Sequence, residues 1–597
     1  MAERLVADLI VERLQAWGVQ RIFGYSGDGI NTVLGALRRS GTLRFVQARH
    51  EENAAFMAVG HAKYTGEVGV MLSTQGPGAV HLLNGLYDAK LDSVPVVAII
   101  GQQPRTVLGS AYMQEIDLLN LTRDVASSFR QQVNSPEQLP LVLDRAFKAA
   151  LTDRAPAVVI IPHDIQQAPA PALEQEHGIV VSSPVWSPPQ LVPAHAGLEA
   201  AAALINDGGK VALLVGQGAR GARNQVRELA EKIGAGITTS LLGKPYVDES
   251  HPLAAGVMGH LGTSASGFVL GECDTLVIIG SNDPWTEFYP PPGAARAVQI
   301  DVDAAAIGNR YPVEVAVTGD AAASLEALLP LLEPRPESAW RSSVEDAVQR
   351  WHRLCAERAA TPARRVNPEL AVRELSDRLP SNAQVAVDVG SIVYWYARQL
   401  RLPEGVPAHL SSTLASMGCS IPYGLAAKLA DPKRPVVALT GDGAMQMAGL
   451  SELITVSRLW PRWVDPRFVV LVLHNNELAE VTWEQREMEG DPRFDQSQAL
   501  PDFSFARYAE LLGLQGILVD DPDKIGAAWN AALDADRPVL IEVLADPDIP
   551  LLPPFPAGEE KGKAMMDALV KEGPDTQHAR DLLDTYLRQE EGLNPGL

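Results

Sequence analysis

The chain has 597 residues, of which 46% are hydrophobic and 21% charged, and its formal net charge is −23. This length predicts about three domains, because one hydrophobic core does not grow that large. The acidic balance argues against nucleic acid as a partner, since a phosphate backbone requires a basic surface. Three widely spaced cysteines argue against a disulfide framework, and no long uncharged apolar run predicts a membrane-spanning helix. The first helix is amphipathic and unlike a signal peptide, so we expect a cytoplasmic protein.

Short apolar runs rich in β-branched residues alternate with longer helical patterns along the chain. The runs that predict strands are 68–73, 95–100, 157–162, 210–216, 275–280, 297–301, 384–390, 435–441, 468–474 and 538–544. Fully apolar strands that alternate with helices are typical of parallel sheets covered on both faces. We therefore predict an α/β protein made of doubly wound parallel sheets.

Two proline-rich stretches divide this pattern. Residues 166–194 are rich in proline and serine, and residues 333–367 hold one helical segment flanked by prolines. Such stretches are typical of interdomain linkers. They predict three domains and a tail, with boundaries at 1–166, 195–333, 367–548 and 549–597.

A glycine-rich turn directly after a predicted strand points to a bound anion. Gly441-Asp442-Gly443 ends the run 435–441 and precedes a helix, whose N-terminus attracts negative charge. Asp442 could hold a divalent cation, and Asn476, directly after the next strand, could supply a neutral oxygen ligand. The similar triplet 27–29 follows no strongly apolar strand and has no such partner, so we interpret it as an ordinary turn.

The combination of this turn with Asn475-Asn476 resembles thiamine-diphosphate (ThDP) enzymes, over about residues 1–555. Within that superfamily the chain is most similar to bacterial pyruvate oxidases and quinone-linked pyruvate dehydrogenases, and more distantly to acetolactate synthases. The segments 48–66, 73–99 and 415–430 carry the resemblance. It implies a pyrimidine-binding domain, a central Rossmann-like domain and a diphosphate-binding domain. It also implies a homodimer or homotetramer with the site at a subunit boundary.

The resemblance assigns a role to individual residues. Glu51 matches the catalytic glutamate that hydrogen-bonds the aminopyrimidine ring, Gln114 an active-site glutamine that faces the substrate, and Glu484 a residue near the reacting carbon. Met417 matches the apolar side chain that supports the bent cofactor. The implied Mg²⁺ ligands are the side chains of Asp442 and Asn476 and the backbone oxygen of Leu478. The other implied ThDP contacts are Gly418, Gly390, Ser391, Gly441, Gly443, Ala444, Pro77 and Asn84.

The central domain contains a dinucleotide-type pattern, Gly216-Gln217-Gly218-Ala219-Arg220-Gly221, after a predicted strand. No acidic residue lies about 20 residues further on, which disfavours NAD. The segments 256–268, 278–290 and 299–308 resemble the FAD-binding segments of quinone-linked pyruvate dehydrogenases. That implies FAD contacts at Gly216, Gly218, Gly259, Ser281, Asn282 and Asp301. The alternative is a domain that has lost its flavin and only spaces the other two.

These observations lead to a functional hypothesis. We expect oxidative decarboxylation of pyruvate or a similar small 2-oxo acid, with electrons passing to FAD and then to quinone, oxygen or another acceptor. The alternatives are an acetolactate synthase-like carboligase and a non-oxidative decarboxylase or lyase. The chain departs from flavin-linked relatives at Met113 and in the longer segment 457–468, which we expect to influence the substrate pocket. It also departs at Asp283, a carboxylate that we expect to alter what the flavin site accepts. The acid-rich C-terminal tail favours packing on the protein's own surface, with docking on a lipid surface as the alternative.

Overall fold

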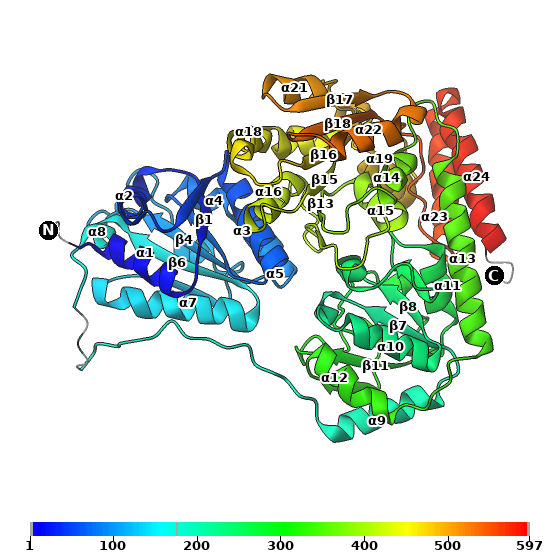
Figure 1. Ribbon diagram of the computed structural model, residues 1–597, viewed down its shortest axis with the longest axis horizontal. Coiled ribbons are helices and arrows are strands. Elements are labelled where there is room, and N and C mark those ends of the chain that lie inside the picture. The colour runs from blue at the N-terminus through cyan, green and yellow to red at the C-terminus, as the bar shows by residue number, and fades with distance from the viewer. Residues whose placement is uncertain (1–3, 173, 175–176, 594–597) are drawn as a thin grey trace.

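The computed structural model describes residues 4–172, 174 and 177–593 and contains three six-stranded sheets (Figure 1). All neighbouring strands within each sheet pair in parallel. Helices cover both faces, so the predicted α/β class with doubly wound parallel sheets is confirmed.

The first domain has the strand order β2-β1-β3-β4-β6-β5. Its strands are β1 (Arg21–Gly24), β2 (Arg44–Gln47), β3 (Gly69–Ser73), β4 (Val96–Gln102), β5 (Phe129–Gln132) and β6 (Pro156–Pro162). Its helices are α1 (Val6–Ala16), α2 (Asn31–Ser40), α3 (Glu51–Thr65), α4 (Pro77–His81), α5 (Leu83–Leu91), α6 (Leu118–Leu121), α7 (Leu139–Asp153) and α8 (His163–Gln167). The central strands β3, β4 and β6 are buried throughout, which explains their continuous apolar runs.

The middle domain has the order β12-β11-β10-β7-β8-β9. Its strands are β7 (Val211–Val215), β8 (Gly236–Thr239), β9 (Ala254–Val257), β10 (Thr275–Ile279), β11 (Arg296–Asp301) and β12 (Val315–Thr318). Its helices are α9 (His195–Asp207), α10 (Arg223–Ile233), α11 (Ser264–Glu272) and α12 (Ala321–Leu328). The strand order reverses between β10 and β7, and open α/β sheets bind ligands at such a switch point.

The third domain has the order β14-β13-β15-β16-β18-β17. Its strands are β13 (Gln384–Val387), β14 (Ala408–His409), β15 (Val436–Gly441), β16 (Phe468–His474), β17 (Gln515–Val519) and β18 (Val539–Leu544). Its helices are α14 (Pro368–Ser376), α15 (Ser391–Gln399), α16 (Ser420–Ala430), α17 (Asp442–Ala444), α18 (Leu450–Leu459), α19 (Ala479–Glu484), α20 (Asp495–Gln498), α21 (Phe505–Leu511) and α22 (Ile525–Leu533).

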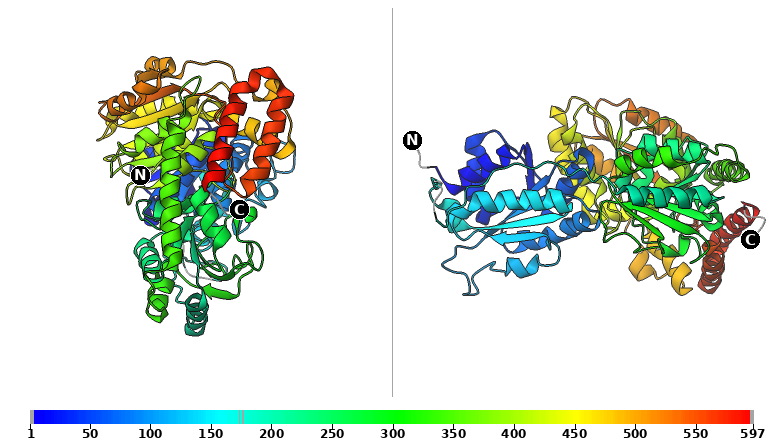
Figure 2. Two further views of the ribbon diagram at one scale, coloured as in Figure 1. Left: turned by 90° about the vertical axis from the view of Figure 1, so that its right-hand side faces the viewer. Right: turned by 90° about the horizontal axis from the view of Figure 1, so that it is seen from below.

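The first domain lies at one end of the molecule and meets the third domain through α3 and α16 (Figures 1 and 2). A single apolar core continues across this boundary, from Phe56 of α3 to Tyr423 of α16. Gly60 permits the close approach, because a Cβ atom there would lie 3.0 Å from the Tyr423 Cα. The two domains are therefore packed as one body within the chain.

The segments between the domains differ in structure. The described part of 169–194 forms neither a helix nor a strand, whereas α13 (Ala339–Ala359) is a long helix beside the C-terminal tail (Figure 1). In the tail, α23 (Ala557–Glu572) packs on the body through Met565 and Leu569, and α24 (Gln577–Leu593) through Leu583 and Tyr586. Among the described residues, no helix is both long and apolar enough to cross a membrane.

Candidate active site

Two glycines at the carboxyl edge of the third sheet border open space. Gly390 follows β13 with a φ of 122°, and Gly441 ends β15. A Cβ atom at either position would meet no other atom within 4 Å. Ser391 begins α15 directly after Gly390, and the N–H groups of a helix start attract anions. This edge therefore fits a diphosphate group.

Asp442 has a buried carboxylate held by three backbone N–H groups. Its Oδ2 accepts from Asn475 and Asn476 at 2.9 and 2.7 Å, and its Oδ1 accepts from Gly443 at 2.9 Å. Burial raises the pKa of Asp442 to about 6, although these hydrogen bonds act in the opposite direction. A divalent cation would offset the burial, because carboxylate oxygens are preferred Mg²⁺ ligands. The position of Asp442 fits a metal ion at the diphosphate edge.

Asn476 and Leu478 lie beside Asp442, but their oxygens have other partners. The Asn476 side-chain oxygen accepts from Arg365 at 3.3 Å. The Leu478 carbonyl accepts the Thr482 N–H at 3.0 Å as α19 begins. To bind a metal, the Asn476 oxygen would have to leave Arg365. The Leu478 carbonyl would have to exchange the longer of its two hydrogen bonds, which the Thr482 hydroxyl donates at 3.3 Å, for the ion.

Met417 lies over the Gly441–Gly443 turn, since its Cε is 3.2 Å from the place of a Cβ on Gly443. Asp388, a buried carboxylate after β13, holds this loop. Its oxygens accept from the Gly418 N–H and the Ser420 hydroxyl, both at 2.6 Å. Gly418 has a φ of 94°, which favours glycine. Asp388 therefore orients the loop that carries the predicted cofactor support. Ala444, which follows this turn directly and ends α17, is buried.

Glu51 begins α3 and is 8% exposed. Its Oε2 lies 2.9 Å from Nδ1 of His81, and the His81 ring lies beside the His50 ring, with centroids 4.3 Å apart and planes tilted by 33°. An ionised carboxylate only accepts hydrogen bonds, so Nδ1 of His81 is the donor. Glu51 thus faces the short helix that begins at Pro77, and His81 orients its carboxylate.

Glu452 of α18 forms hydrogen bonds with residues on either side of Glu51 and so links them to the third domain. Its Oε1 accepts the Arg49 N–H at 2.6 Å and the Asn53 side-chain N–H at 3.2 Å. Glu452 is 0% exposed, and burial raises its pKa against the effect of these bonds. Because these partners lie two residues before and after Glu51, Glu452 sets where Glu51 stands. Glu452 was not predicted from the sequence, where it stands as a single acid within an apolar helix.

Asn84 makes a second bridge to the cofactor loop. Its side-chain nitrogen donates to Glu52 Oε1 at 2.7 Å and to Ser416 Oγ at 2.8 Å. Ser416 directly precedes Met417. Asn84, a predicted ThDP contact of the first domain, therefore connects the Glu51 region to the cofactor loop of the third domain. The joining occurs within one chain, and the expected completion of the site by a second subunit stays a prediction.

Gln114 lies in a polar cluster at the edge of the first sheet. Its Oε1 accepts from Gln75 at 3.0 Å, and the same Gln75 nitrogen donates to Asp28 at 3.1 Å. Gln114 is exposed and has a φ of 62°. Asp28 belongs to the triplet 27–29, which forms a turn after β1 as expected. Gln75 thus links Asp28 to Gln114, a connection that the sequence did not predict.

Lys63 and Asp92 form a buried ion pair where the first domain meets the third. Lys63 Nζ lies 2.7 Å from Asp92 Oδ2 and donates to the Leu410 carbonyl at 2.6 Å. Asp92 also accepts the backbone N–H groups of Ser412 and Thr413 at 3.0 and 2.9 Å. The pair therefore fixes the start of the loop that leads to the cofactor support.

Glu484 lies at the end of α19, one helical turn after a second carboxyl group. Burial and the repulsion of Glu484 raise the pKa of Glu480 to about 8. Burial also raises the pKa of Glu484, and His260 of the middle domain lies within electrostatic range of it. The predicted Glu484 is thus close to the middle domain, and Glu480 is a residue that the sequence analysis missed.

The residues expected to bind FAD lie at the carboxyl end of the middle sheet, and they are Gly216, Gly218, Gly259, Ser281, Asn282 and Asp301. The Gly218 N–H donates to the Gly280 carbonyl at 3.0 Å, so the glycine turn packs directly on the neighbouring loop. The Ser281 hydroxyl is buried and without a hydrogen-bond partner in the described part of the chain. This free hydroxyl is compatible with a nucleotide at that edge.

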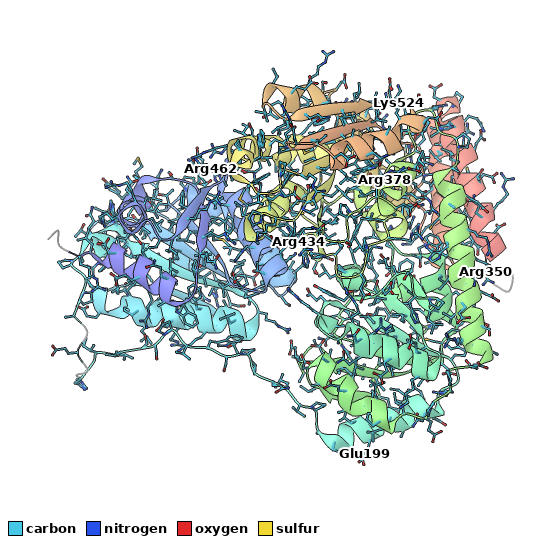
Figure 3. All side chains as sticks on the ribbon, in the orientation of Figure 1. Glu199, Arg350, Arg378, Arg434, Arg462 and Lys524 are labelled. Carbon is cyan, nitrogen blue, oxygen red and sulfur yellow. The ribbon has the colours of Figure 1, made fainter. Side chains whose placement is uncertain are left out.

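The longer segment 457–468 lies at the opposite edge of the third sheet from Asp442, because it leads into the start of β16. Arg458 donates to Gln47 of the first domain at 2.7 Å. Arg462 in the same segment, labelled in Figure 3, lies beside the first domain. The described contacts of this segment are thus at the domain boundary, and its influence on the substrate pocket stays a prediction.

Family models for thiamine pyrophosphate enzymes match all three domains. The N-terminal TPP binding domain matches residues 4–121, the central domain residues 198–328, and the C-terminal TPP binding domain residues 388–543. The chain belongs to the thiamine-diphosphate-dependent enzyme family, as the resemblance predicted.

Curated relatives cover nearly the whole chain. A putative thiamine pyrophosphate-containing protein YdaP of Bacillus subtilis is 34% identical over 94% of this chain and 95% of its own length. The acetolactate synthase isozyme 2 large subunit of Escherichia coli is 32% identical over 93% and 98%. The probable acetolactate synthase large subunit of Methanocaldococcus jannaschii is 31% identical over 92% and 93%. The chain is similar to these proteins over all three domains.

Proposed function

We propose that this enzyme decarboxylates a small 2-oxo acid such as pyruvate and joins the resulting carbon nucleophile to a second carbonyl compound. The observation that carries the proposal is the position of Glu51, which Glu452 holds against the third domain. The open edge at Gly390 and Gly441 belongs to that same domain. The relatives named acetolactate synthases support a carbon–carbon bond as the product.

The residues have separate tasks in this proposal. When bound, thiamine diphosphate supplies an electron sink for the charge that remains when CO₂ leaves a 2-oxo acid. Asp442, Asn476 and Leu478 would hold Mg²⁺, which neutralises the diphosphate. Glu51 would hold a proton at the pyrimidine ring nitrogen, and His81 keeps its carboxylate oriented.

A second candidate is oxidative decarboxylation, with FAD and then quinone, oxygen or another acceptor taking the electrons. The buried hydroxyl of Ser281 favours it, because this group has no hydrogen-bond partner in the described structure. The sequence segments 256–268 and 299–308 also favour it through their resemblance to flavin-linked enzymes. The two candidates differ in product, acetate or acetyl phosphate against a linked hydroxyketone.

The test is product analysis by NMR with pyruvate, ThDP and Mg²⁺. We expect acetolactate or a related hydroxyketone, and acetate as the main product would favour the second candidate. The Glu51→Gln variant should lose about 10²- to 10⁴-fold in turnover, the usual contribution of a positioned acid or base. Glu12→Gln is the matched control, because Glu12 is exposed and pairs with Arg4 at the surface. Full turnover by Glu51→Gln would refute the proposed role.

A further inference from the structure

A flavin that oxidises a substrate needs its ring at the reacting group as well as its nucleotide at the sheet edge. If Glu484 lies near the reacting carbon, as the resemblance implies, the ring would have to reach the boundary between the middle-domain loops and the third domain, where Glu484 lies. The loop 258–262 forms this boundary and packs tightly on α15. Arg398 of α15 donates to the carbonyls of His260, Leu261 and Gly262 at 3.2, 3.2 and 3.0 Å.

Three polar side chains fill the boundary and lie within ion-pair distance of one another, although the angles leave His260 Nε2 and Glu487 Oε1 without a hydrogen bond in the described structure. His260 Nε2 lies 3.1 Å from Glu487 Oε2, and each of the two side chains is 1% exposed. Lys561 of α23 lies 2.9 Å from Glu487 Oε1 and 3.2 Å from His260 Nδ1. An ammonium group only donates, so Nδ1 is the acceptor and the Nε2 proton faces Glu487. The positive charge of Lys561 and the negative charge of Glu487 thereby compensate each other.

Aromatic rings enclose these three side chains. The His260 ring stacks on Trp285 at 5.3 Å and lies 5.9 Å from Tyr394 and 6.4 Å from Phe288. Trp285 in turn presses on the backbone, because its Cδ1 is 2.7 Å from the place of a Cβ on Gly259. A flavin ring at this boundary would have to displace the stacked rings of His260 and Trp285. It would also have to separate the Glu487 carboxylate from Lys561, and breaking a buried ion pair is costly.

We propose that His260, Glu487 and Lys561 form a wall that takes the place of a flavin ring, so that the middle domain offers no ring site within reach of Glu484. The residues therefore do not fit a complete FAD. The adenosine diphosphate part could still bind near Ser281, whose buried hydroxyl has no hydrogen-bond partner in the described structure. The C-terminal tail takes part in the wall through Lys561. The inference rests on the proposed function, in which a second carbonyl compound and not a flavin accepts the carbon nucleophile.

The test compares the affinities of FAD and ADP for the enzyme loaded with ThDP and Mg²⁺, by calorimetry and flavin fluorescence. If the ring finds no site, the two ligands should have equal Kd values within about threefold, or neither should bind. FAD binding about tenfold or more tighter than ADP, with quenched flavin fluorescence, would overturn the proposal. Because no turnover is measured, a failure of the proposed carboligation would leave this result unaffected.

Opening the wall provides the converse test. His260→Gly should raise the affinity for FAD relative to ADP by about tenfold or more, since stacking area becomes available to the ring. His251→Gly is the matched control, because His251 lies in the same domain and contacts Glu231. If His260→Gly folds and keeps the wild-type ratio, the wall does not exclude the ring and the proposal is wrong. If it does not fold, the wild-type comparison decides alone.

Discussion

Asp88 offers a quantitative test of the boundary between the first and third domains. Its side chain is 0% exposed, accepts the hydroxyl of Tyr423 and lies 3.7 Å from Lys63 Nζ. We consider the variant Asp88→Asn, which keeps the size and the ability to accept a hydrogen bond but cannot ionise. The comparison isolates the free energy of ionising this carboxyl group inside the boundary.

Burial raises the pKa of Asp88 from its ordinary value of 3.8 to about 6, because Lys63 compensates only part of the burial and Asp92 repels. The folded state therefore binds this proton more tightly than the unfolded state. The associated stability is fully present below about pH 4 and is lost as the pH rises through about 6. At about 1.4 kcal/mol per pH unit, the loss amounts to about 3 kcal/mol.

The assay is urea unfolding followed by tryptophan fluorescence at about pH 4 and about pH 7. Relative to the wild type, Asp88→Asn should gain about 3 kcal/mol in free energy of unfolding between the two values. Asp124→Asn is the control, since Asp124 is an exposed carboxyl group paired with Lys90. A difference from the wild type that is the same at both pH values would refute the assignment of a raised pKa to Asp88.

Three further predictions concern the cofactor edge and the thiols. Gly441→Ala should change the free energy of unfolding of the cofactor-free enzyme by less than about 0.5 kcal/mol, because a methyl group meets only open space. It should weaken ThDP binding in calorimetry about tenfold or more, because the methyl group would take the place of the diphosphate. Asp442→Asn should abolish Mg²⁺-dependent retention of ThDP in gel filtration, since it removes the charged ligand. Iodoacetamide should leave the three native thiols, Cys273, Cys355 and Cys419, unmodified, as mass spectrometry would show. Burial raises the pKa of each thiol, to about 12 for Cys273 and Cys355, so that little reactive thiolate is present.

Each of these predictions has a contrary outcome. Unchanged ThDP affinity in Gly441→Ala would mean that the diphosphate does not lie at this edge. Retention of ThDP by Asp442→Asn without Mg²⁺ dependence would remove Asp442 from the metal site. Rapid labelling of native thiols would contradict their burial, whereas labelling only in urea is expected.

The strands that the sequence predicts are the interior ones. All the apolar runs singled out from the sequence correspond to strands, among them β3, β4, β15 and β16. The strands it missed include every sheet edge: β2, β5, β9, β12, β14 and β17. An interior strand is buried on both faces and reads as a continuous apolar run, whereas an edge strand such as β17 is partly exposed and lacks that signal.

The sequence by itself determined the chemistry at the strand ends. The turn Gly441–Gly443 and the residues after β16 lie together because carboxyl ends of parallel strands meet at one edge, a local rule that spacing reveals. Only the tertiary structure decided which side chains meet across domains. Glu452 reaches Arg49 over 403 residues of sequence, and Lys561 reaches His260 and Glu487 from the tail. Such contacts depend on how whole domains pack, because no sequence periodicity encodes the distance between residues on separate cores.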